Sequence, residues 1–344
     1  MLRLPSFRFF QPSSLGEALA IFAGEGPSVR LVAGGTDLWP NMKRRHQTAA
    51  TVVSLMRVPE LSGYGSISSN GSSAFSIGAT TRLDQLTAEP AVNERYPAFA
   101  RAVRSISSPP LRNMATIGGN LCVDTRCTYY NQTEEWRRSI DYCLKEKGSV
   151  CWVAPGSSVC WAHSASDSAP ILTALGARVV LRNADTEREI PLTELYENDG
   201  ISYLNIRPGE ILTKIEVPED SSADHCRTAF WKLRRRGSID FAVLSVAVAL
   251  WLGDDGTVER INVVLGAVAS RPLEVREAGS LAVGSKLDLE GVRAVARAAR
   301  RAATPMDNTD FRTQWRGLMV ERYTEAALCE AASIPHRSAP PPHL

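Results

Sequence analysis

The first half of the chain alternates short apolar runs with glycine-containing turns. β-Branched residues dominate several of these runs and predict buried strands over residues 29–33, 51–56, 74–80 and 177–181. Apolar residues at helical spacing predict helices over residues 15–22, 83–86, 96–105 and 171–175. Ser14 and Glu17 stand at the positions of a capping box for the first of these helices. Strands and helices therefore alternate up to about residue 182.

The second half of the chain has a different pattern. Apolar runs predict antiparallel strands over residues 211–217, 228–235, 241–252 and 258–268, and helical periodicity follows over residues 289–303 and 311–332. The whole pattern predicts an α+β protein with one unit at residues 1–182 and a sheet-plus-helix unit at residues 185–333. Residues 334–344 contain three consecutive prolines, and we expect this tail to be disordered.

Two glycine pairs lie about 80 residues apart in the first unit. Gly34-Gly35 follows the strand at 29–33, and Gly118-Gly119 follows a threonine. Glycine pairs permit positive φ and let backbone N–H groups approach an anion. Two such loops could close on one extended phosphorylated cofactor. Neither pair has the form of a dinucleotide-binding fingerprint or of a P-loop, which argues against both common nucleotide-binding folds.

Five of the seven cysteines are concentrated just after the second glycine pair. Residues 127–160 have no sustained helical or strand period, so we predict a long loop of the kind that is usually functional or disordered. The loop cannot bury a large core of its own, so something else must hold its shape. A metal centre in it would adjoin the cofactor. The four cysteines inside the loop are Cys127, Cys143, Cys151 and Cys160, and Cys122 lies upstream.

Three kinds of cysteine chemistry compete for this loop. Disulfides are typical of small secreted modules, but the N-terminus lacks the apolar run of a signal peptide. Structural zinc usually takes two close cysteine knuckles, and only Cys122 and Cys127 come that close. An iron–sulfur cluster needs four thiolates, whose spacing can be wide when a loop wraps the cluster. The residues alone favour the cluster and leave the other two open.

Composition excludes several other classes of protein. The chain has 344 residues, 44% of them hydrophobic and 22% charged, as in ordinary globular proteins. A net charge of +2 gives no sign of a nucleic-acid partner. No apolar run reaches the ~20 residues that a membrane span requires. We therefore expect a cytoplasmic protein that contacts neither nucleic acid nor membrane.

Several motifs resemble one known family, the FAD-binding medium subunits of the xanthine dehydrogenase family of molybdenum hydroxylases. They are AGGTDL at 33–38, TIGGNL at 116–121, SDSAPIL at 166–172, FWKLRRRGSIDFA at 230–242 and PMDNTDFRTQWRGLMVERY at 305–323. The resemblance covers nearly the whole chain. It implies a two-part FAD-binding domain of the PCMH/VAO type, followed by a C-terminal domain like that of the carbon monoxide dehydrogenase flavoprotein, with an antiparallel sheet plus helices.

Most members of that family lack the cysteine loop. The run NLCVDTRCTYYNQTEEWRRSIDYCLKEKGSVC at 120–151 resembles the insertion found in one branch, the β subunits of 4-hydroxybenzoyl-CoA reductases, where the loop carries a [4Fe–4S] cluster. The resemblance implies an inserted iron–sulfur loop at residues 122–162. The ligands that it implies are Cys127, Cys143, Cys151 and Cys160, and Cys122 is left as a spare thiol.

The resemblance also implies residues that bind FAD. Asp124 and Asp167 would accept hydrogen bonds from ribityl or ribose hydroxyls. Lys232 would lie near the flavin ring, where a cation stabilises reduced flavin, although an exposed strand lysine is an equal alternative. The two glycine loops would hold the diphosphate through the residues Leu31, Val32, Ala33, Gly34, Gly35, Thr36, Asp37, Leu38, Thr116, Ile117, Gly118, Gly119 and Asn120.

The implied function is electron transfer within a larger enzyme. Electrons would pass from ferredoxin to the [4Fe–4S] cluster, then to FAD, to a [2Fe–2S] small subunit and to a molybdopterin-binding large subunit, in a dimer of heterotrimers. That enzyme removes the phenolic hydroxyl of 4-hydroxybenzoyl-CoA, and this chain would hold no catalytic residue. Two alternatives remain: the FAD subunit of an aerobic hydroxylase whose loop holds zinc or nothing, and a redox-sensing module with regulatory disulfides.

Overall fold

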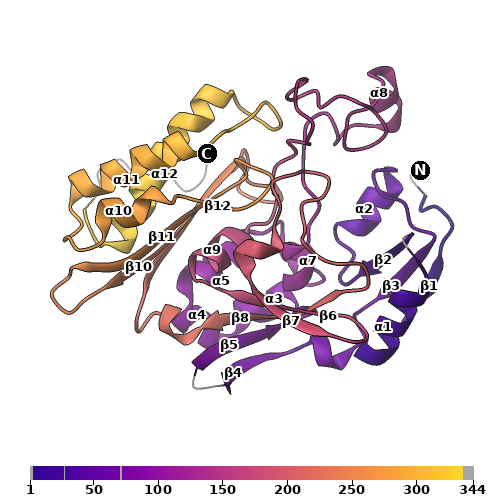
Figure 1. Ribbon diagram of the computed structural model, residues 1–344, viewed down its shortest axis with the longest axis horizontal. Helices are drawn as coiled ribbons and strands as arrows, with labels where there is room; N and C mark the ends of the chain where they lie inside the picture. The colour runs from indigo at the N-terminus through magenta and orange to yellow at the C-terminus, as the bar shows by residue number, and fades with distance from the viewer. Residues whose placement is uncertain (1–2, 27, 70–71, 336–344) are drawn as a thin grey trace.

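The computed structural model describes residues 3–26, 28–69 and 72–335. Most of the tail that we expected to be disordered, residues 336–344, lies outside this range. The described residues form three sheets, one near the N-terminus, one in the middle and one near the C-terminus (Figure 1). No helix of the described residues is long and apolar enough to cross a membrane.

The N-terminal sheet is parallel, with the strand order β1-β3-β2. Parallel neighbours need crossover connections, and two helices supply them. Ser14 caps the first helix by accepting a hydrogen bond from the Glu17 N–H, as the sequence predicted. The elements are β1 (Arg8–Phe10), α1 (Leu15–Gly24), β2 (Val29–Val32), α2 (Leu38–Lys43) and β3 (Thr51–Ser54).

The middle sheet is antiparallel, with the order β4-β5-β8-β6-β7. Its strands are β4 (Tyr64–Ser69), β5 (Ser72–Gly78), β6 (Arg178–Arg182), β7 (Glu187–Pro191) and β8 (Ile211–Pro218). The helices of this unit are α3 (Leu83–Ala88), α4 (Pro90–Arg95), α5 (Pro97–Ser105), α6 (Pro109–Arg112), α7 (Ile117–Leu121) and α9 (Ser168–Ala174). Short 3₁₀ turns lie at η1 (Pro59–Leu61), η2 (Leu192–Leu195) and η3 (Glu219–Ser221).

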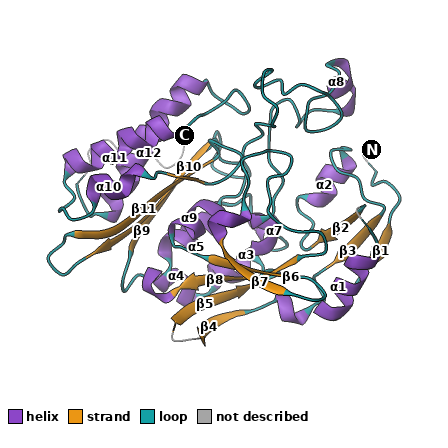
Figure 2. Ribbon diagram, in the orientation of Figure 1, coloured by secondary structure: helices purple, strands orange, loops and turns teal. Residues whose placement is uncertain are grey.

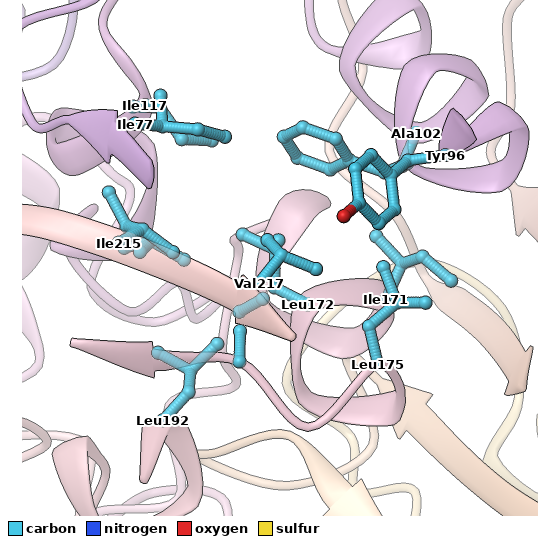
Figure 3. Packing of buried hydrophobic residues seen from close by; sticks show 14 of the residues in the cluster. Ile77, Tyr96, Ala102, Ile117, Ile171, Leu172, Leu175, Leu192, Ile215 and Val217 are labelled. Carbon is cyan, nitrogen blue, oxygen red and sulfur yellow. The ribbon is translucent and has the colours of Figure 1, made fainter. Parts of the chain in front are cut away.

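Strand β8 is where the sequence analysis went wrong. We placed residues 211–217 in the second unit, but β8 pairs with β5 on one side and β6 on the other. Ile215 and Val217 enter the same core as Ile77 and the side chains of α9 (Figure 3). A boundary between Pro218 and Arg227 would keep each sheet whole, and we propose it in place of residues 182–185.

The C-terminal sheet lies between two layers of helices. It has the order β12-β11-β10-β9, with neighbouring strands antiparallel. Both faces of the sheet are covered. Successive side chains of β10 enter two different cores, one shared with the helices that follow the sheet and one shared with the middle unit. This explains its continuous apolar run. The elements are β9 (Arg227–Leu233), β10 (Leu244–Leu252), β11 (Val258–Gly266), β12 (Leu273–Glu274), α10 (Glu277–Ala282), α11 (Leu289–Ala302) and α12 (Thr313–Ala331).

The cysteine loop leaves the body of the molecule as an irregular segment with one short helix, α8 (Glu134–Ser139) (Figure 2). Its two ends are joined by backbone hydrogen bonds. The Arg126 N–H donates to the His163 carbonyl at 2.9 Å, and the His163 N–H donates to the Arg126 carbonyl at 2.8 Å. The pair forms an isolated antiparallel bridge that closes the loop at its base.

Arg316 of α12 joins the last helix to the C-terminal sheet. Its side chain is fully buried and donates to the carbonyl oxygens of Val243, Ala267 and Met306 at 2.7–3.0 Å. Burial lowers the pKa of Arg316 to about 10. Substitution Arg316→Met should lower the free energy of unfolding by about 3 kcal/mol, because it leaves buried carbonyls without donors.

Urea denaturation followed by circular dichroism measures this loss. Arg322→Met is the matched control, since Arg322 is exposed on the same helix. Equal unfolding midpoints for the two variants would contradict the assigned role of Arg316.

Candidate functional site

A pocket of about 540 Å³ opens where the two glycine loops meet. We call it the glycine-loop pocket. Both loops contribute to its wall, and so does the segment after β9 through Ile239, Asp240 and Phe241. The sequence-predicted residues that line it are Leu31, Val32, Ala33, Gly34, Gly35, Thr36, Asp37, Leu38, Thr116, Gly119, Asn120, Asp124 and Asp167. Residues from the two separate motifs are thus brought to one cavity.

Three predicted residues do not line the pocket. Ile117 is fully buried in the core of the middle unit. Gly118 packs against the end of β5, where a methyl group would lie 2.7 Å from Ala79 Cβ, so its glycine serves close packing. Lys232 reaches the pocket only through the carboxylate of Asp167.

The first glycine loop is shaped by contact with the second. A methyl group on Gly34 would overlap the Met114 carbonyl oxygen, just before the TIGGNL motif. Gly35 has φ of 71°, and a methyl group there would overlap the Trp39 indole. Glycine is therefore required at both positions, at the first by a close approach of two backbones and at the second by backbone conformation.

An ion pair joins the first glycine loop to the base of the cysteine loop. The Arg126 guanidinium binds the Asp37 carboxylate, and its Nη1 donates to Asn41 Oδ1 at 3.2 Å. The Asp124 N–H donates to the second Asp37 oxygen at 3.3 Å. Burial raises the pKa of Asp37, and the neighbouring Arg126 opposes that rise. Asp37 therefore braces both loops around the pocket.

Two buried carboxylates in the pocket wall keep an oxygen without a hydrogen-bond partner. Asp124 Oδ1 accepts from Lys145 at 2.6 Å, and Asp167 Oδ2 accepts from Lys232 at 2.7 Å. The other oxygen of each, Asp124 Oδ2 and Asp167 Oδ1, has none among the described residues. Buried acceptors without donors are costly, so such atoms suit a ligand that brings hydroxyl groups.

The pair of Lys232 and Asp167 excludes the alternative of an exposed strand lysine. The side chain of each is only 4% exposed. Burial raises the pKa of Asp167 and lowers the pKa of Lys232, while their mutual attraction opposes both shifts. Lys232 Nζ also donates to the Ser105 carbonyl at 3.0 Å, so the ammonium is fixed behind the pocket.

The four loop cysteines surround a second, smaller cavity, which we call the cysteine cavity. Cys127, Cys143, Cys151 and Cys160 are all buried and all line it. All seven cysteines of the chain are free. Burial raises the pKa of Cys127 to about 12 and that of Cys160 to about 11. Without a metal the thiols of Cys127 and Cys160 are therefore neutral, and metal binding would release their protons.

The spacing of these thiols bears on the kind of metal group that fits. Among the described residues, no three histidine, cysteine or acidic side chains are placed to hold a single metal ion. The four cysteines instead line one small cavity of about 10 Å³. Four thiolates are the ligand number of both a tetrahedral zinc ion and a [4Fe–4S] cluster, so the donor set by itself suits either group.

Hydrogen bonds and one buried arginine hold the shape of the loop. The Glu146 and Gly148 N–H groups donate to the Cys143 carbonyl at 2.9 and 3.1 Å, forming a turn beside that cysteine. The Arg137 side chain is 1% exposed, pairs with Glu134 and Glu146, and donates to the Arg44 carbonyl at 3.0 Å. The loop tip is thereby attached to the end of α2.

Two residues that the sequence analysis missed lie between the cavities. Lys145 and Tyr130 line both the glycine-loop pocket and the cysteine cavity. The sequence analysis also missed Gly200, where a methyl group would lie 2.8 Å from Cys160 Sγ. No local motif marks these residues, because the fold alone brings them to the site.

Comparisons with known proteins extend over nearly the whole chain. A family model described as "FAD binding domain in molybdopterin dehydrogenase" matches residues 5–220, and one described as "CO dehydrogenase flavoprotein C-terminal domain" matches residues 228–331. These matches define a flavoprotein subunit. The chain belongs to the family of FAD-binding medium subunits of molybdenum hydroxylases that includes carbon monoxide dehydrogenase and xanthine dehydrogenase.

Individual relatives agree with this assignment. The carbon monoxide dehydrogenase medium chain of Hydrogenophaga pseudoflava is 28% identical over 332 residues, covering 95% of this chain and 99% of that one. The 6-hydroxypseudooxynicotine dehydrogenase complex subunit alpha of Paenarthrobacter nicotinovorans is 25% identical over 339 residues, 98% of each chain. A solved carbon monoxide dehydrogenase from H. pseudoflava has a TM-score of 0.78 at 25% identity, covering 97% of this chain and 100% of that chain. The α+β fold and its two-domain type are confirmed.

Substitution Gly34→Ala should remove most of the FAD from the purified chain. The added methyl group overlaps the Met114 backbone and forces the two glycine loops apart. Flavin absorbance per protein after desalting measures the effect. Gly24→Ala is the control, since nothing lies within 4 Å of a methyl group there. Full FAD retention by Gly34→Ala would show that the loops do not hold the cofactor.

His46 should make the protein sensitive to mild acid. Burial lowers the pKa of His46 to about 4, whereas an unfolded histidine titrates near ~6.5. Between these two pH values His46 is protonated in the unfolded chain and neutral in the folded chain. The free energy of unfolding therefore decreases as the pH falls below about 6.5. We expect His46→Gln to reduce that loss by up to about 1.4 kcal/mol per pH unit.

Urea midpoints between pH 7.5 and 5 test this expectation. The exposed residue His225 supplies the control variant, His225→Gln. A pH dependence shared by all three proteins would contradict a buried neutral His46.

Proposed function

We propose that this chain is the FAD- and [4Fe–4S]-carrying electron-transfer subunit of a 4-hydroxybenzoyl-CoA reductase. The observation that carries the proposal is the convergence of four buried cysteines on one cavity that shares a wall with the glycine-loop pocket. Family membership supports the FAD, and the cysteine cavity supports a second redox group.

The donor set fits an iron–sulfur cluster. Cys127, Cys143, Cys151 and Cys160 supply four thiols, the number that a [4Fe–4S] cluster takes. The loop is closed at its base and attached at its tip, so its ligands are held in place by protein contacts. A cluster bound there would supply one-electron transfer to the neighbouring flavin.

The residues of the glycine-loop pocket fit FAD. The backbone of residues 31–38 and of Thr116, Gly119 and Asn120 would hold the diphosphate. Asp124 and Asp167 offer free carboxylate oxygens for ribityl or ribose hydroxyls. Lys232 would act through Asp167, contributing positive charge near reduced flavin. FAD supplies the exchange between single electrons and electron pairs.

The remainder of the enzyme would consist of other chains. A [2Fe–2S] small subunit and a molybdopterin-binding large subunit complete the proposed assembly, a cytoplasmic dimer of heterotrimers that receives electrons from ferredoxin. On the large subunit, 4-hydroxybenzoyl-CoA, two electrons and two protons give benzoyl-CoA and water. The present chain holds no catalytic residue in this scheme. Names such as "medium chain" and "FAD-subunit" among its relatives support a multi-subunit enzyme.

A second candidate is the FAD subunit of a hydroxylase that acts on another substrate. Relatives named as carbon monoxide, glyceraldehyde and nicotinate dehydrogenases favour it. In that case electrons leave through FAD to an acceptor, and the cysteine loop holds zinc or no metal.

Metal and flavin analysis under anaerobic conditions separates the two candidates. We expect four irons and four acid-labile sulfides per FAD in the purified chain, because four thiols surround the cysteine cavity. Cys143→Ser should lose most of the iron and retain FAD, since Cys143 does not line the glycine-loop pocket. Cys329→Ser, far from both cavities in the C-terminal core, is the control. FAD with zinc, or without metal, would leave the second candidate.

A further inference from the structure

The ammonium of Lys145 is buried between the two cavities. Its side chain is 6% exposed, and Nζ donates to Asp124 Oδ1 at 2.6 Å and to the carbonyls of Gly200 and Thr125 at 2.9 and 3.1 Å. A buried charge is costly unless it is paired and hydrogen-bonded, and this one is both. The fold therefore maintains a positive charge at this point.

Tyr130 lies beside that charge, and the two side chains form the wall between the glycine-loop pocket and the cysteine cavity. Its ring is 2% exposed and lies 4.8 Å from Lys145 Nζ, in the range of a cation–π contact. It packs in one cluster with Cys127, Cys143 and Cys160. Its ring centre lies 4.7 Å from that of His46, with the two rings tilted by 33°, and its hydroxyl donates to the His46 carbonyl at 2.7 Å. Both side chains of the wall are buried, so the local dielectric is lower than that of water.

Ion pairs flank this wall, and one of them joins Glu146 to Arg137, whose guanidinium lies 6.0 Å from the centre of the Tyr130 ring. Asp37 pairs with Arg126 at the base of the cysteine loop, and Asp124 pairs with Lys145. Within the pair of Asp124 and Lys145 the carboxylate belongs to the glycine-loop pocket alone, whereas the ammonium lines both cavities. The ammonium is therefore the member of that pair that reaches the cysteine side of the wall, and Asp124 offsets part of its field there.

We propose that Lys145 is a positioning residue that sets the reduction potential of the cluster and links it electrostatically to the flavin. The inference rests on the proposed function. Reduction adds negative charge to each group, and a nearby fixed cation stabilises the reduced form in a low dielectric. Lys145 favours reduction on both sides of the wall, and Asp124 offsets part of that effect.

Redox titration of the purified holo-chain, followed by electron paramagnetic resonance and flavin absorbance, tests the proposal. In Lys145→Met the ratio of reduced to oxidised cluster at a fixed potential should fall by about tenfold, with a shift of the flavin in the same direction. Lys145→Arg keeps the charge and should stay near the wild-type ratio. Lys147→Met is the control, because Lys147 is 61% exposed in the same loop.

Iron, sulfide and FAD are counted first in every variant. A wild-type chain without iron and sulfide would refute the proposed function and not the role of Lys145. A loaded Lys145→Met variant with wild-type potentials would overturn the role, and so would equal shifts in Lys145→Met and Lys145→Arg.

A second variant covers the case in which Lys145→Met does not load. Asp124→Asn leaves the ammonium uncompensated, so the potential of the cluster should shift in the opposite direction and favour reduction. An unshifted potential in Asp124→Asn, or failure of both variants to load, would assign Lys145 a purely structural role and overturn the proposal.

Discussion

Arg126 is the residue on which the two halves of the site depend. Its backbone closes the base of the cysteine loop by bonding to His163, and its guanidinium holds Asp37 of the first glycine loop. The same cation lies 4.7 Å from the centre of the Phe241 ring, in the segment that joins β9 to β10 of the C-terminal sheet. One buried side chain thus fixes three segments that are far apart in the sequence. The relative position of the two cavities follows from it.

Much of the fold could be predicted from the sequence because most of its elements carry local signals. Strands β2, β3 and β6 follow β-branched runs, and α11 and α12 have helical periodicity over more than ten residues each. The two glycine loops were recognisable because glycine meets a specific backbone requirement at Gly34 and Gly35. The concentration of four cysteines in residues 127–160 was enough to predict a site for cysteine chemistry there. Properties that depend on a residue type and its immediate neighbours can be predicted from the sequence alone.

The rest could not be predicted, because it depends on contacts between distant segments. Lys145 looks like any polar loop residue until folding brings Asp124 and the Gly200 carbonyl to its ammonium. The apolar alternation of β8 would be the same in either sheet. Its local sequence therefore could not predict that it pairs with β5. Gly118 shows a second limit of the sequence: the motif predicts a ligand contact, which stays a prediction, whereas close packing against Ala79 is visible only in the fold.

The late position of β8 in the chain also determines when the middle sheet can form during synthesis. Strand β5 ends at Gly78, but its partner β8 begins only at Ile211, so the middle sheet cannot close until residue 218 has left the ribosome. All four cysteines of the loop, the last at Cys160, emerge before that moment. The nascent chain therefore exposes its thiols before the middle sheet can close. A cofactor that binds before closure meets a chain whose middle sheet is incomplete, and one that binds afterwards meets the folded site.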